Sequence, residues 1–259
     1  FLTTAPHLMS GPRLVQILMG KQNVIIQEHL CPCHTMEQDM SYDGTRVAIG
    51  AYDNYGNGIE SGHVRVFDYS SSSDEWTQVG PDIDGEAEYD HSGASVSISL
   101  DGTRVAIGAD KNDGVNGSLS GHVRVYEYSS PSGWIKLGSD IDGEGAGDKS
   151  GKSVSLSSYG TRVAIGAWYN DANGSNSGHV RVYEFSSPGG WIQLGSDIDG
   201  EGAGDRFGWS VSLSSDGNRV AIGGPWNDGM TGLDSGQFRV YEYSSLGGWT
   251  QLGSDIDGE

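Results

Sequence analysis

One phrase is written four times in this sequence of 259 residues. The pentapeptide RVAIG begins at Arg46, Arg104, Arg162 and Arg219, so the intervals are 58, 58 and 57 residues. A second phrase, SGHVRVYEY or a close variant, and then a tryptophan follow at the same interval. A repeat of this length indicates one supersecondary unit that buries its apolar faces against the next copy.

Each unit has the period of β-strands. SVSLS at residues 153–157 and HVRVYEF at residues 179–185 alternate apolar and polar side chains, and no segment of any length has a helical period. The segments between them, such as NDANGSNSG, are typical of turns, and glycine makes up 42 of the 259 residues. The sequence therefore predicts an all-β fold, a β-propeller built of four-stranded antiparallel blades.

The last unit contains the motifs that resemble a known repeat family. The stretch DRFGWSVSLSSDGNRVAIGGPWNDG, which begins at Asp205, resembles the FG-GAP repeat of integrin α-subunit propellers. Phe207-Gly208 stands at the "FG" and Gly223-Gly224-Pro225 at the "GAP". The resemblance covers residues 40–259 unevenly, since the other units have Ser-Gly in place of "FG" and replace the proline.

The resemblance sets the expected domain boundaries. We expect blades at residues 40–86, 87–144, 145–201 and 202–259, the first without a proper first strand. Because propellers of this family usually close with about seven blades, we interpret these four as an incomplete arc of a larger propeller. The family's calcium loop does not carry over, because the corresponding segment SLSSDGNRV is too short and contains one acidic residue.

Residues 1–39 contain no copy of the repeat. When residues 66–88 are written in plausible codons and translated one base out of frame, they give the sequence of residues 1–22. We therefore predict that this N-terminal segment is an out-of-frame reading of one more repeat, disordered or poorly structured, and that the gene continues upstream.

The two cysteines of the chain lie in this segment, at Cys31 and Cys33, beside His34. One Cys-x-Cys-His supplies too few ligands to close a structural zinc site. If the segment is an out-of-frame reading, these three residues form no functional site. If it is a genuine extension, they return as candidates for a metal or redox site.

The composition limits the kinds of partner that this chain can bind. Lys and Arg number 15 against 35 Asp and Glu, which gives a net charge of −20. Such a surface repels phosphate and attracts cations, so nucleic acid is excluded as a partner. No apolar run approaches the roughly 18 residues that a membrane-spanning helix needs, so we expect no membrane insertion within this segment.

An acidic loop, DIDGEGAGD or a variant, recurs in each unit and is the candidate site for a cofactor, Ca²⁺. Carboxylates two residues apart around a glycine turn can converge on one cation, and Ca²⁺ takes six to eight oxygen ligands. The alternative is a solvated connection between blades, with Asp and Gly chosen for turn geometry. The candidate calcium ligands are Asp82, Asp84, Glu86, Asp90, Asp140, Asp142, Glu144, Asp148, Asp197, Asp199, Glu201 and Asp205.

A histidine recurs at His63, His122 and His179, and it is replaced by Gln237 in the last unit. Equivalent side chains of different blades lie too far apart to share one metal, so we expect these residues to pack structurally. The arginines two residues later are expected to pair with nearby acids between blades. They are Arg65, Arg124, Arg181 and Arg239.

The units differ most in the loops after AIGA, which makes these loops the candidate site for recognition. Tyr52, Trp168, Tyr169 and Trp226 are aromatic residues set among Asn and Asp on one expected face of the propeller, a combination that suits a carbohydrate or protein ligand. The alternative is that they are partly buried rings of long hairpin loops. Asn116 and Asn173 in the same loops are weak candidates for glycosylation.

No nucleophile triad, phosphate loop or nucleotide fingerprint occurs, so we expect that the chain is not an enzyme. The sequence favours a non-catalytic binding, adhesion or scaffold module that recognises a protein or glycan through its loops, and that depends on calcium if the acidic loops hold Ca²⁺. The integrin resemblance implies an extracellular or cell-surface location. The alternatives are a propeller-type polysaccharide hydrolase or lyase, with its site in blades that this sequence lacks, and a purely structural repeat array.

Overall fold

In the computed structural model the chain divides into two units, residues 1–35 and residues 36–259. The described part of the first unit is one antiparallel pair of strands, β1 (Val15–Met19) and β2 (Gln22–Ile26). Cys31, Cys33 and His34 lie outside the described residues, and their interpretation stays a prediction. The structure describes residues 15–19, 22–26, 36–228 and 234–258.

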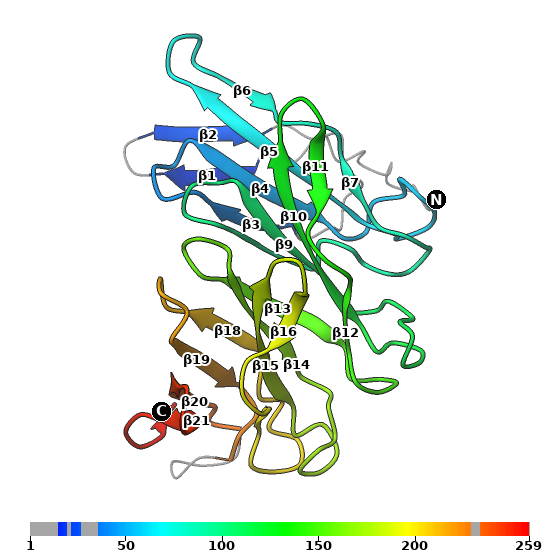
Figure 1. The fold of residues 1–259 in the computed structure, drawn as a ribbon. Coiled ribbons are helices and arrows are strands. Elements are labelled where there is room, and N and C mark those ends of the chain that lie inside the picture. The colour runs from blue at the N-terminus through cyan, green and yellow to red at the C-terminus, as the bar shows by residue number, and fades with distance from the viewer. Residues whose placement is uncertain (1–14, 20–21, 27–35, 229–233, 259) are drawn as a thin grey trace, which may run out of the picture. The chain divides into compact units, whose positions relative to one another are not determined.

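The second unit consists of four antiparallel sheets that repeat one plan (Figure 1). In each sheet four strands pair in sequence order, and a fifth strand of two residues pairs with the third. The predicted all-β fold with four-stranded propeller blades is confirmed. No helix among the described residues has the length and apolar character needed to cross a membrane.

The blades follow one another along the chain as four sets of strands. Blade 1 is β3 (Glu37–Met40), β4 (Arg46–Ala51), β5 (His63–Ser70), β6 (Glu75–Gln78) and β7 (Ile83–Asp84). Blade 2 is β8 (Ser95–Ile98), β9 (Arg104–Ala109), β10 (His122–Ser129), β11 (Gly133–Lys136) and β12 (Ile141–Asp142). Blade 3 is β13 (Ser150–Leu156), β14 (Arg162–Ala167), β15 (His179–Ser186), β16 (Gly190–Gln193) and β17 (Ile198–Asp199). Blade 4 is β18 (Ser210–Leu213), β19 (Arg219–Gly224), β20 (Gln237–Ser244), β21 (Gly248–Gln251) and β22 (Ile256–Asp257).

Blade 1 has a first strand, which we did not expect. β3 pairs with β4 across the boundary that we placed at residues 39 and 40. Asp39 of this strand also joins blade 1 to blade 2, because its carboxylate accepts hydrogen bonds from Ser97 Oγ and Ile98 N. At the next boundary Ser97 Oγ accepts from Leu156 N in the same way, so Asp39 takes the place of a repeat serine.

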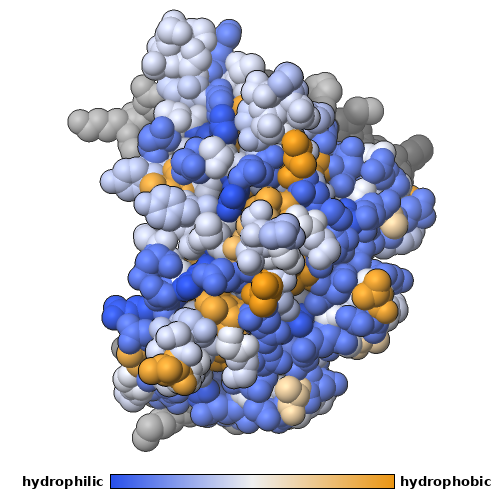
Figure 2. Space-filling model, viewed as in Figure 1, coloured by the Kyte–Doolittle hydropathy of each residue, from blue (hydrophilic) through white to orange (hydrophobic). Residues whose placement is uncertain are grey.

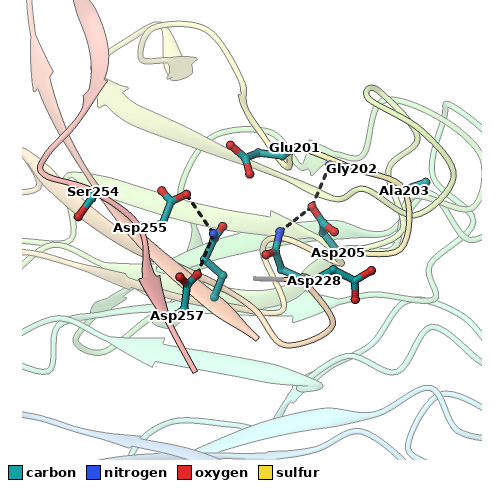
Figure 3. Close-up of a pocket in the computed structure, with 10 residues that line it drawn as sticks. Glu201, Gly202, Ala203, Asp205, Asp228, Ser254, Asp255 and Asp257 are labelled. Atoms are coloured by element: carbon teal, nitrogen blue, oxygen red, sulfur yellow. Dashed lines mark hydrogen bonds between the residues drawn. The ribbon is translucent and has the colours of Figure 1, made fainter. Parts of the chain in front are cut away.

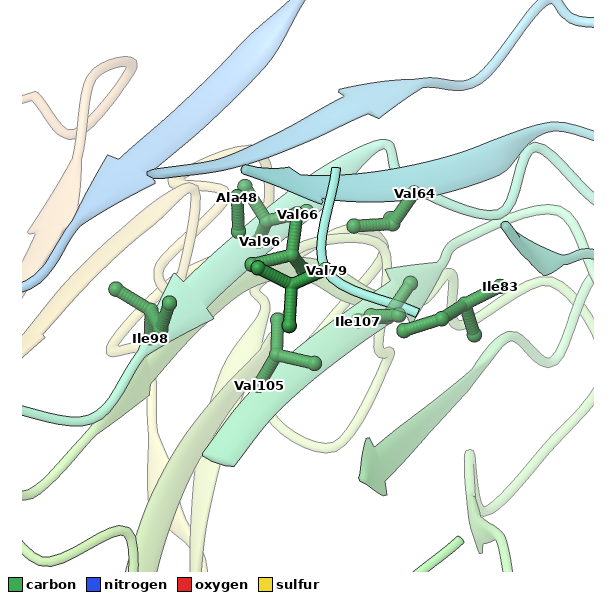
Figure 4. Packing of buried hydrophobic residues seen from close by; sticks show 9 residues of the cluster. All are labelled: Ala48, Val64, Val66, Val79, Ile83, Val96, Ile98, Val105 and Ile107. Carbon is green, nitrogen blue, oxygen red and sulfur yellow. The ribbon is translucent and has the colours of Figure 1, made fainter. Parts of the chain in front are cut away.

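The core lies between the blades. The cluster shared by blades 1 and 2 contains Val64 and Val66 of β5 and Val105 and Ile107 of β9 (Figure 4). The second strands of blades 1 to 3 are buried along nearly their whole length, and in blades 2 and 3 this is because neighbouring blades cover both faces. In the view of Figure 2 the surface is mostly hydrophilic, and the apolar residues on it form small separate patches.

The closing tryptophan of a blade fastens it to the blade before. Trp134 Nε1 donates a hydrogen bond of 2.8 Å to the carbonyl of Val79, and Trp191 Nε1 donates one of 2.7 Å to that of Leu137. Trp249 repeats the bond with Leu194. The tryptophans are therefore structural residues of the blade boundary.

Glycine is required where adjacent blades meet. A Cβ on Gly108 of β9 would lie 2.1 Å from the carbonyl oxygen of Gly151, at the start of the next blade. Gly166 approaches Gly208 in the same way, with a distance of 2.0 Å. These pairs join the glycine of RVAIG to the glycine of the "FG" position, which explains why both positions are kept.

Blade 4 has one face that is open among the described residues. Ile256 of its short fifth strand is 52% exposed, whereas the equivalent Ile198 of blade 3 is 4% exposed and lies in the core shared with blade 4. Phe238 is likewise exposed where Val180 is buried. The interpretation as an incomplete arc of a larger propeller stays a prediction.

Replacing Gly108 with Ala should lower the free energy of unfolding by about 3 kcal/mol, because the new methyl group overlaps the backbone of the next blade. Gly223 occupies the same place in β19 of blade 4, where a Cβ would meet only the Ser210 side chain. The matched variant Gly223→Ala should change stability by less than about 1 kcal/mol. Urea unfolding of the two variants measures the difference, and equal losses would contradict this account of the blade contact.

Candidate functional site

The start of each first strand lies beside the end of each second strand, because the two strands are antiparallel. In blade 3, Ser150 at the start of β13 pairs with Ala167 at the end of β14. The first strands of successive blades also contact one another. Residues that flank these strand ends in adjacent blades therefore gather on one surface.

Four aromatic rings gather there. The ring centroids of Trp168 and Tyr169 are 3.9 Å apart, and those of Trp168 and Trp209 are 4.6 Å apart at an interplanar angle of 85°. Trp226 follows at 4.9 Å from Trp209, also edge to face. All four side chains are partly exposed. The structure thus brings together three of the four aromatic residues that we predicted for ligand binding.

Trp209 was missed by the sequence analysis. It follows the "FG" glycine of blade 4, where blades 2 and 3 have Ala94 and Lys152. The signal was present, because this position differs between units in the same way as the loops after AIGA. We searched only the loops for such variation.

Three cations lie over these rings. The guanidinium carbon of Arg206 is 4.1 Å from the Trp226 ring centroid. Lys149 Nζ is 4.3 Å from the centroid of Tyr169, and Lys152 Nζ is 5.0 Å from that of Trp209. We call Lys149, Lys152, Trp168, Tyr169, Arg206, Trp209 and Trp226 the aromatic–cationic surface.

These cations form no ion pair with an acid within 4 Å in the part of the chain that the structure describes. The repeated arginines are all paired, for example Arg104 with Glu127 at 2.8 Å and Arg162 with Glu184 at 2.8 Å. Lys136 pairs with Asp140 at 2.7 Å. In a chain with a net charge of −20, three cations without an ion pair among the described residues therefore lie at one site.

Asp110 of blade 2 extends this surface. It occupies the loop position that Trp168 has in blade 3, and it is buried. Burial raises the pKa of Asp110, and the charges of Lys152, His91, Lys111 and Lys149 oppose this rise in that order.

Tyr52 does not join the aromatic–cationic surface. Its ring stacks on His91 with the centroids 5.2 Å apart, at the boundary between blades 1 and 2. Lys111 Nζ lies 3.2 Å from His91 Nε2. Tyr52 stays a prediction as a ligand-binding residue, in an environment different from that of Trp168.

The acids of one acidic loop have separate partners. In blade 2, Asp140 accepts hydrogen bonds from Arg124 and Lys136, whereas Asp148 caps the backbone N–H of Gly145 and accepts from Asn170. Among the described residues, no group of three close ligand atoms comes from the acids of one loop alone. Calcium binding by a single loop therefore stays a prediction.

The Glu of each loop reaches the next blade instead. Glu86 pairs with Arg124, and Glu201 pairs with Arg239. Glu144 lies 3.5 Å from Arg181. The expected pairing of these arginines with acids between blades is present in the structure.

Each repeated histidine lies among acids, and those of His63 are Asp82 and Asp84 of its own blade, whereas His122 and His179 also meet a Glu of the blade before. His122 is gathered with Glu86 and Asp140, and His179 with Glu144 and Asp197. Burial lowers the pKa of His179 to about 4. No two of these histidines share a group of close ligand atoms among the described residues, and each has carboxylates within reach. The histidines therefore lie beside carboxylates in addition to packing against their neighbours.

An acidic cavity of about 590 Å³ lies at the boundary of blades 3 and 4 (Figure 3). Gln237 takes the place of the histidine there and donates hydrogen bonds to Asp255 and Asp257. Asp205 accepts from the backbone of Gly202 and from Asn227. The cavity is lined by Glu201, Gly202, Ala203, Asp205, Asn227, Asp228, Gln237, Ser254, Asp255 and Asp257.

The two candidate glycosylation residues have a structural partner. The side-chain nitrogen of Asn116 donates a hydrogen bond of 2.7 Å to the carbonyl of Gly143, and that of Asn173 donates one of 2.9 Å to Gly200. Asn57, which is in no acceptor sequence, makes the same bond to Gly85. This shared bond accounts for the recurrence of asparagine, and glycosylation stays a prediction.

Comparison with known proteins supports the identity of the repeat. Residues 141–183 and 198–241 match the family model of the FG-GAP repeat. The predicted resemblance to this repeat is confirmed. No curated protein matches the chain.

Solved structures share the fold at low sequence identity. A proposed 6-phosphogluconolactonase of Bacteroides uniformis has a TM-score of 0.63 and 11% identity, over 95% of this chain and 65% of that one. A periplasmic gluconolactonase of Pseudomonas aeruginosa has a TM-score of 0.54 and 14% identity, over 94% and 63%. TolB of Acinetobacter baumannii has a TM-score of 0.50 and 14% identity, over 92% and 48%. The chain therefore spans less than two thirds of the length of these structures.

These similarities correct one expectation. We expected that the chain is not an enzyme, because it contains none of the local catalytic motifs. Two of the structures with this fold carry the names of lactonases, which overturns that exclusion. The physical reason is that loops of different blades can jointly supply catalytic groups, so a propeller needs no local motif, and the fold itself decides nothing about catalysis.

Replacing Asp110 with Asn should stabilise the protein at pH 7. Because burial raises the folded-state pKa of Asp110, ionising it costs folding free energy above that pKa. As the pH falls through the folded pKa toward the ordinary value of an aspartate, both states become protonated and the gain should disappear. Urea unfolding at neutral and acidic pH measures this, with Glu75→Gln on exposed β6 as the control for net charge. A gain that is the same at both pH values would contradict this assignment.

Proposed function

We propose that this chain of FG-GAP repeats is a binding module that recognises an acidic carbohydrate through its aromatic–cationic surface. The observation that carries the proposal is the placement of three unpaired cations over four clustered aromatic rings in a strongly acidic chain. Elsewhere in the described residues the repeated cations are paired with acids of the repeat.

The rings supply the part of the site that suits a sugar. Aromatic faces bind the apolar C–H faces of pyranose rings, and large rigid side chains lose little entropy on binding. The indole Nε1 of Trp168 is buried and has no hydrogen-bond partner among the described residues.

The cations would select a ligand that carries a negative charge. Arg206 can bind a carboxylate or phosphate through two parallel N–H groups, while Lys149 and Lys152 offer point charges. Charges a few ångströms away act on the ligand more strongly than the acidic remainder of the surface, because salt screens interactions beyond about 8 Å. A sugar with one acidic group therefore fits better than a polyanion such as nucleic acid.

The setting of this binding is part of the proposal. We propose an extracellular or cell-surface location with a role in adhesion, supported by the FG-GAP repeats and their resemblance to integrin propellers. Calcium at the acidic loops would be a structural addition to this function, since the aromatic–cationic surface includes none of the candidate calcium ligands.

A pair of charge-matched variants tests the proposed binding. Arg206→Gln should weaken binding of a uronic-acid oligosaccharide at least about ten-fold, because it removes the cation nearest Trp226. Arg219→Gln removes the same charge from an exposed pair with Glu242 and should leave affinity unchanged. Calorimetry and tryptophan fluorescence with the acidic oligosaccharide and its neutral counterpart measure both effects. Equal losses, equal affinity for the neutral sugar, or binding only to a protein ligand would overturn the proposal.

A second candidate function is hydrolysis of an acidic sugar lactone, and a specific observation favours it. Buried Asp110 has a raised pKa and lies beside the cations of the same surface. In this reaction Asp110 takes a proton from water, and the oxygen of that water adds to the lactone carbonyl. The ring C–O bond then breaks, and Asp110 returns the proton to the leaving ring oxygen, which gives a hydroxy acid. The names of two structures with this fold are consistent with such a substrate.

A titration of released acid tests the second function. The chain should open 6-phosphogluconolactone faster than the uncatalysed rate, and Asp110→Asn should reduce the enzymatic rate at least about a hundred-fold, as expected for a general base. An unchanged rate in the variant, or no rate above background, would reject hydrolysis by Asp110. Sugar binding without turnover would leave the binding function standing alone.

A further inference from the structure

His179, the first residue of β15, is buried without a hydrogen-bond partner. It is 1% exposed, and among the described residues neither ring nitrogen has a hydrogen bond. Its Nδ1 faces three carboxylate oxygens, at 3.9 Å from Glu144, 3.9 Å from Asp197 and 4.0 Å from Asp199. These distances are too long for hydrogen bonds.

The spacing fits a metal ion between the four groups. A metal bound tetrahedrally at about 2.0 to 2.2 Å separates a ligand nitrogen and oxygen by about 3.4 Å, so each of the three oxygens would move about half an ångström toward the imidazole on binding. Ligand atoms of Glu144, His179 and Asp197 all lie within 4.8 Å of one another. Asp199 Oδ1 is buried and also lacks a hydrogen bond.

The local charge fits a dication. Glu144, Asp197 and Asp199 carry three negative charges when ionised. Arg181 is the nearby cation, and its guanidinium contacts the other oxygen of Glu144 at 3.5 Å and the carbonyl of Asp142 at 2.8 Å. The cluster therefore has an excess of two negative charges.

In two other blades, side-chain donors of the protein bond the carboxylates at the equivalent positions. In blade 2 Arg124 and Lys136 both bond Asp140. In blade 4 Gln237 takes the place of the histidine, and its amide nitrogen donates to Asp255 at 3.0 Å and Asp257 at 3.3 Å.

Blade 3 has neither arrangement. Gln193 donates to one oxygen of Asp197 at 2.6 Å and leaves the other facing His179. No hydrogen bond or ion pair joins Arg181 to Asp197 in the described chain. Blade 3 therefore lacks the arginine or glutamine donor that bonds the equivalent carboxylate in blades 2 and 4.

We propose that Glu144, His179, Asp197 and Asp199 bind one transition-metal dication, such as Zn²⁺ or Mn²⁺, at the boundary of blades 2 and 3. The imidazole ligand favours a transition metal, whereas Ca²⁺ and Mg²⁺ prefer oxygen ligands alone. Glu144 comes from the loop that ends blade 2, and the other ligands belong to blade 3. The metal ties the two blades together, independently of ligand binding at the aromatic–cationic surface.

The test titrates the chelator-treated full chain with Co²⁺ and Zn²⁺. Cys31 and Cys33 are both changed to Ser, so that they bind no metal. We expect one Co²⁺ per chain with visible d–d absorption, displaced by Zn²⁺, and a higher Tm with metal. His179→Gln copies the side chain found in blade 4 and should weaken binding at least ten-fold. The matched His122→Gln should leave it unchanged.

Three results would overturn the proposal. They are the absence of stoichiometric binding, an equal loss in the two histidine variants, and binding of Ca²⁺ that His179→Gln does not affect. Circular dichroism establishes that the variants fold. If His179→Gln does not fold, Glu144→Gln takes its place, because this side chain is half exposed and its loss leaves the strand intact. Full metal affinity in that variant would likewise reject the site.

Discussion

The close approach of glycine backbones between successive blades is the constraint on which the rest of this structure depends. Where Gly108 meets Gly151 there is no space for a single methyl group. The approach lets valine and isoleucine side chains fill the space between the sheets, and it brings the closing tryptophan of one blade within hydrogen-bond distance of the blade before. The contacts that the repeated residues make therefore lie mainly at the boundaries between blades.

This arrangement explains why most charged groups of the repeat are used internally. The Glu of an acidic loop meets an arginine of the next blade, and the first Asp of the loop pairs with an arginine of its own blade, as Asp82 does with Arg65. A site for an external ligand must then come from residues that the repeat does not specify. Lys149, Lys152 and Arg206 are such residues, and they lie together over aromatic rings.

The sequence predicted the blades well, because period-two strands and their turns recur in each unit and both are local properties. It predicted three of the four clustered rings for the same reason, since they stand in the loops that vary. Trp209 was missed because it follows a strand boundary and not a loop. The first strand of blade 1 was missed because its pairing is made by backbone groups, with Asp39 in place of a serine.

Two searches of the sequence had the same limit. We looked for metal ligands within one loop and for catalytic residues within one motif, whereas charged groups of successive blades also meet in the structure. Glu144 and His179 are distant in the sequence and lie 3.9 Å apart in the structure. Such contacts depend on the register between sheets, which a single sequence does not state.

The most direct test of the central claim is a crystal structure of the chain with a bound uronic-acid oligosaccharide. The account predicts density for a sugar ring against Trp168, Trp209 or Trp226, with its acidic group bound by Arg206 or one of the two lysines. Density in the acidic cavity around Asp255 and Asp257, or on another face of the blades, would contradict it.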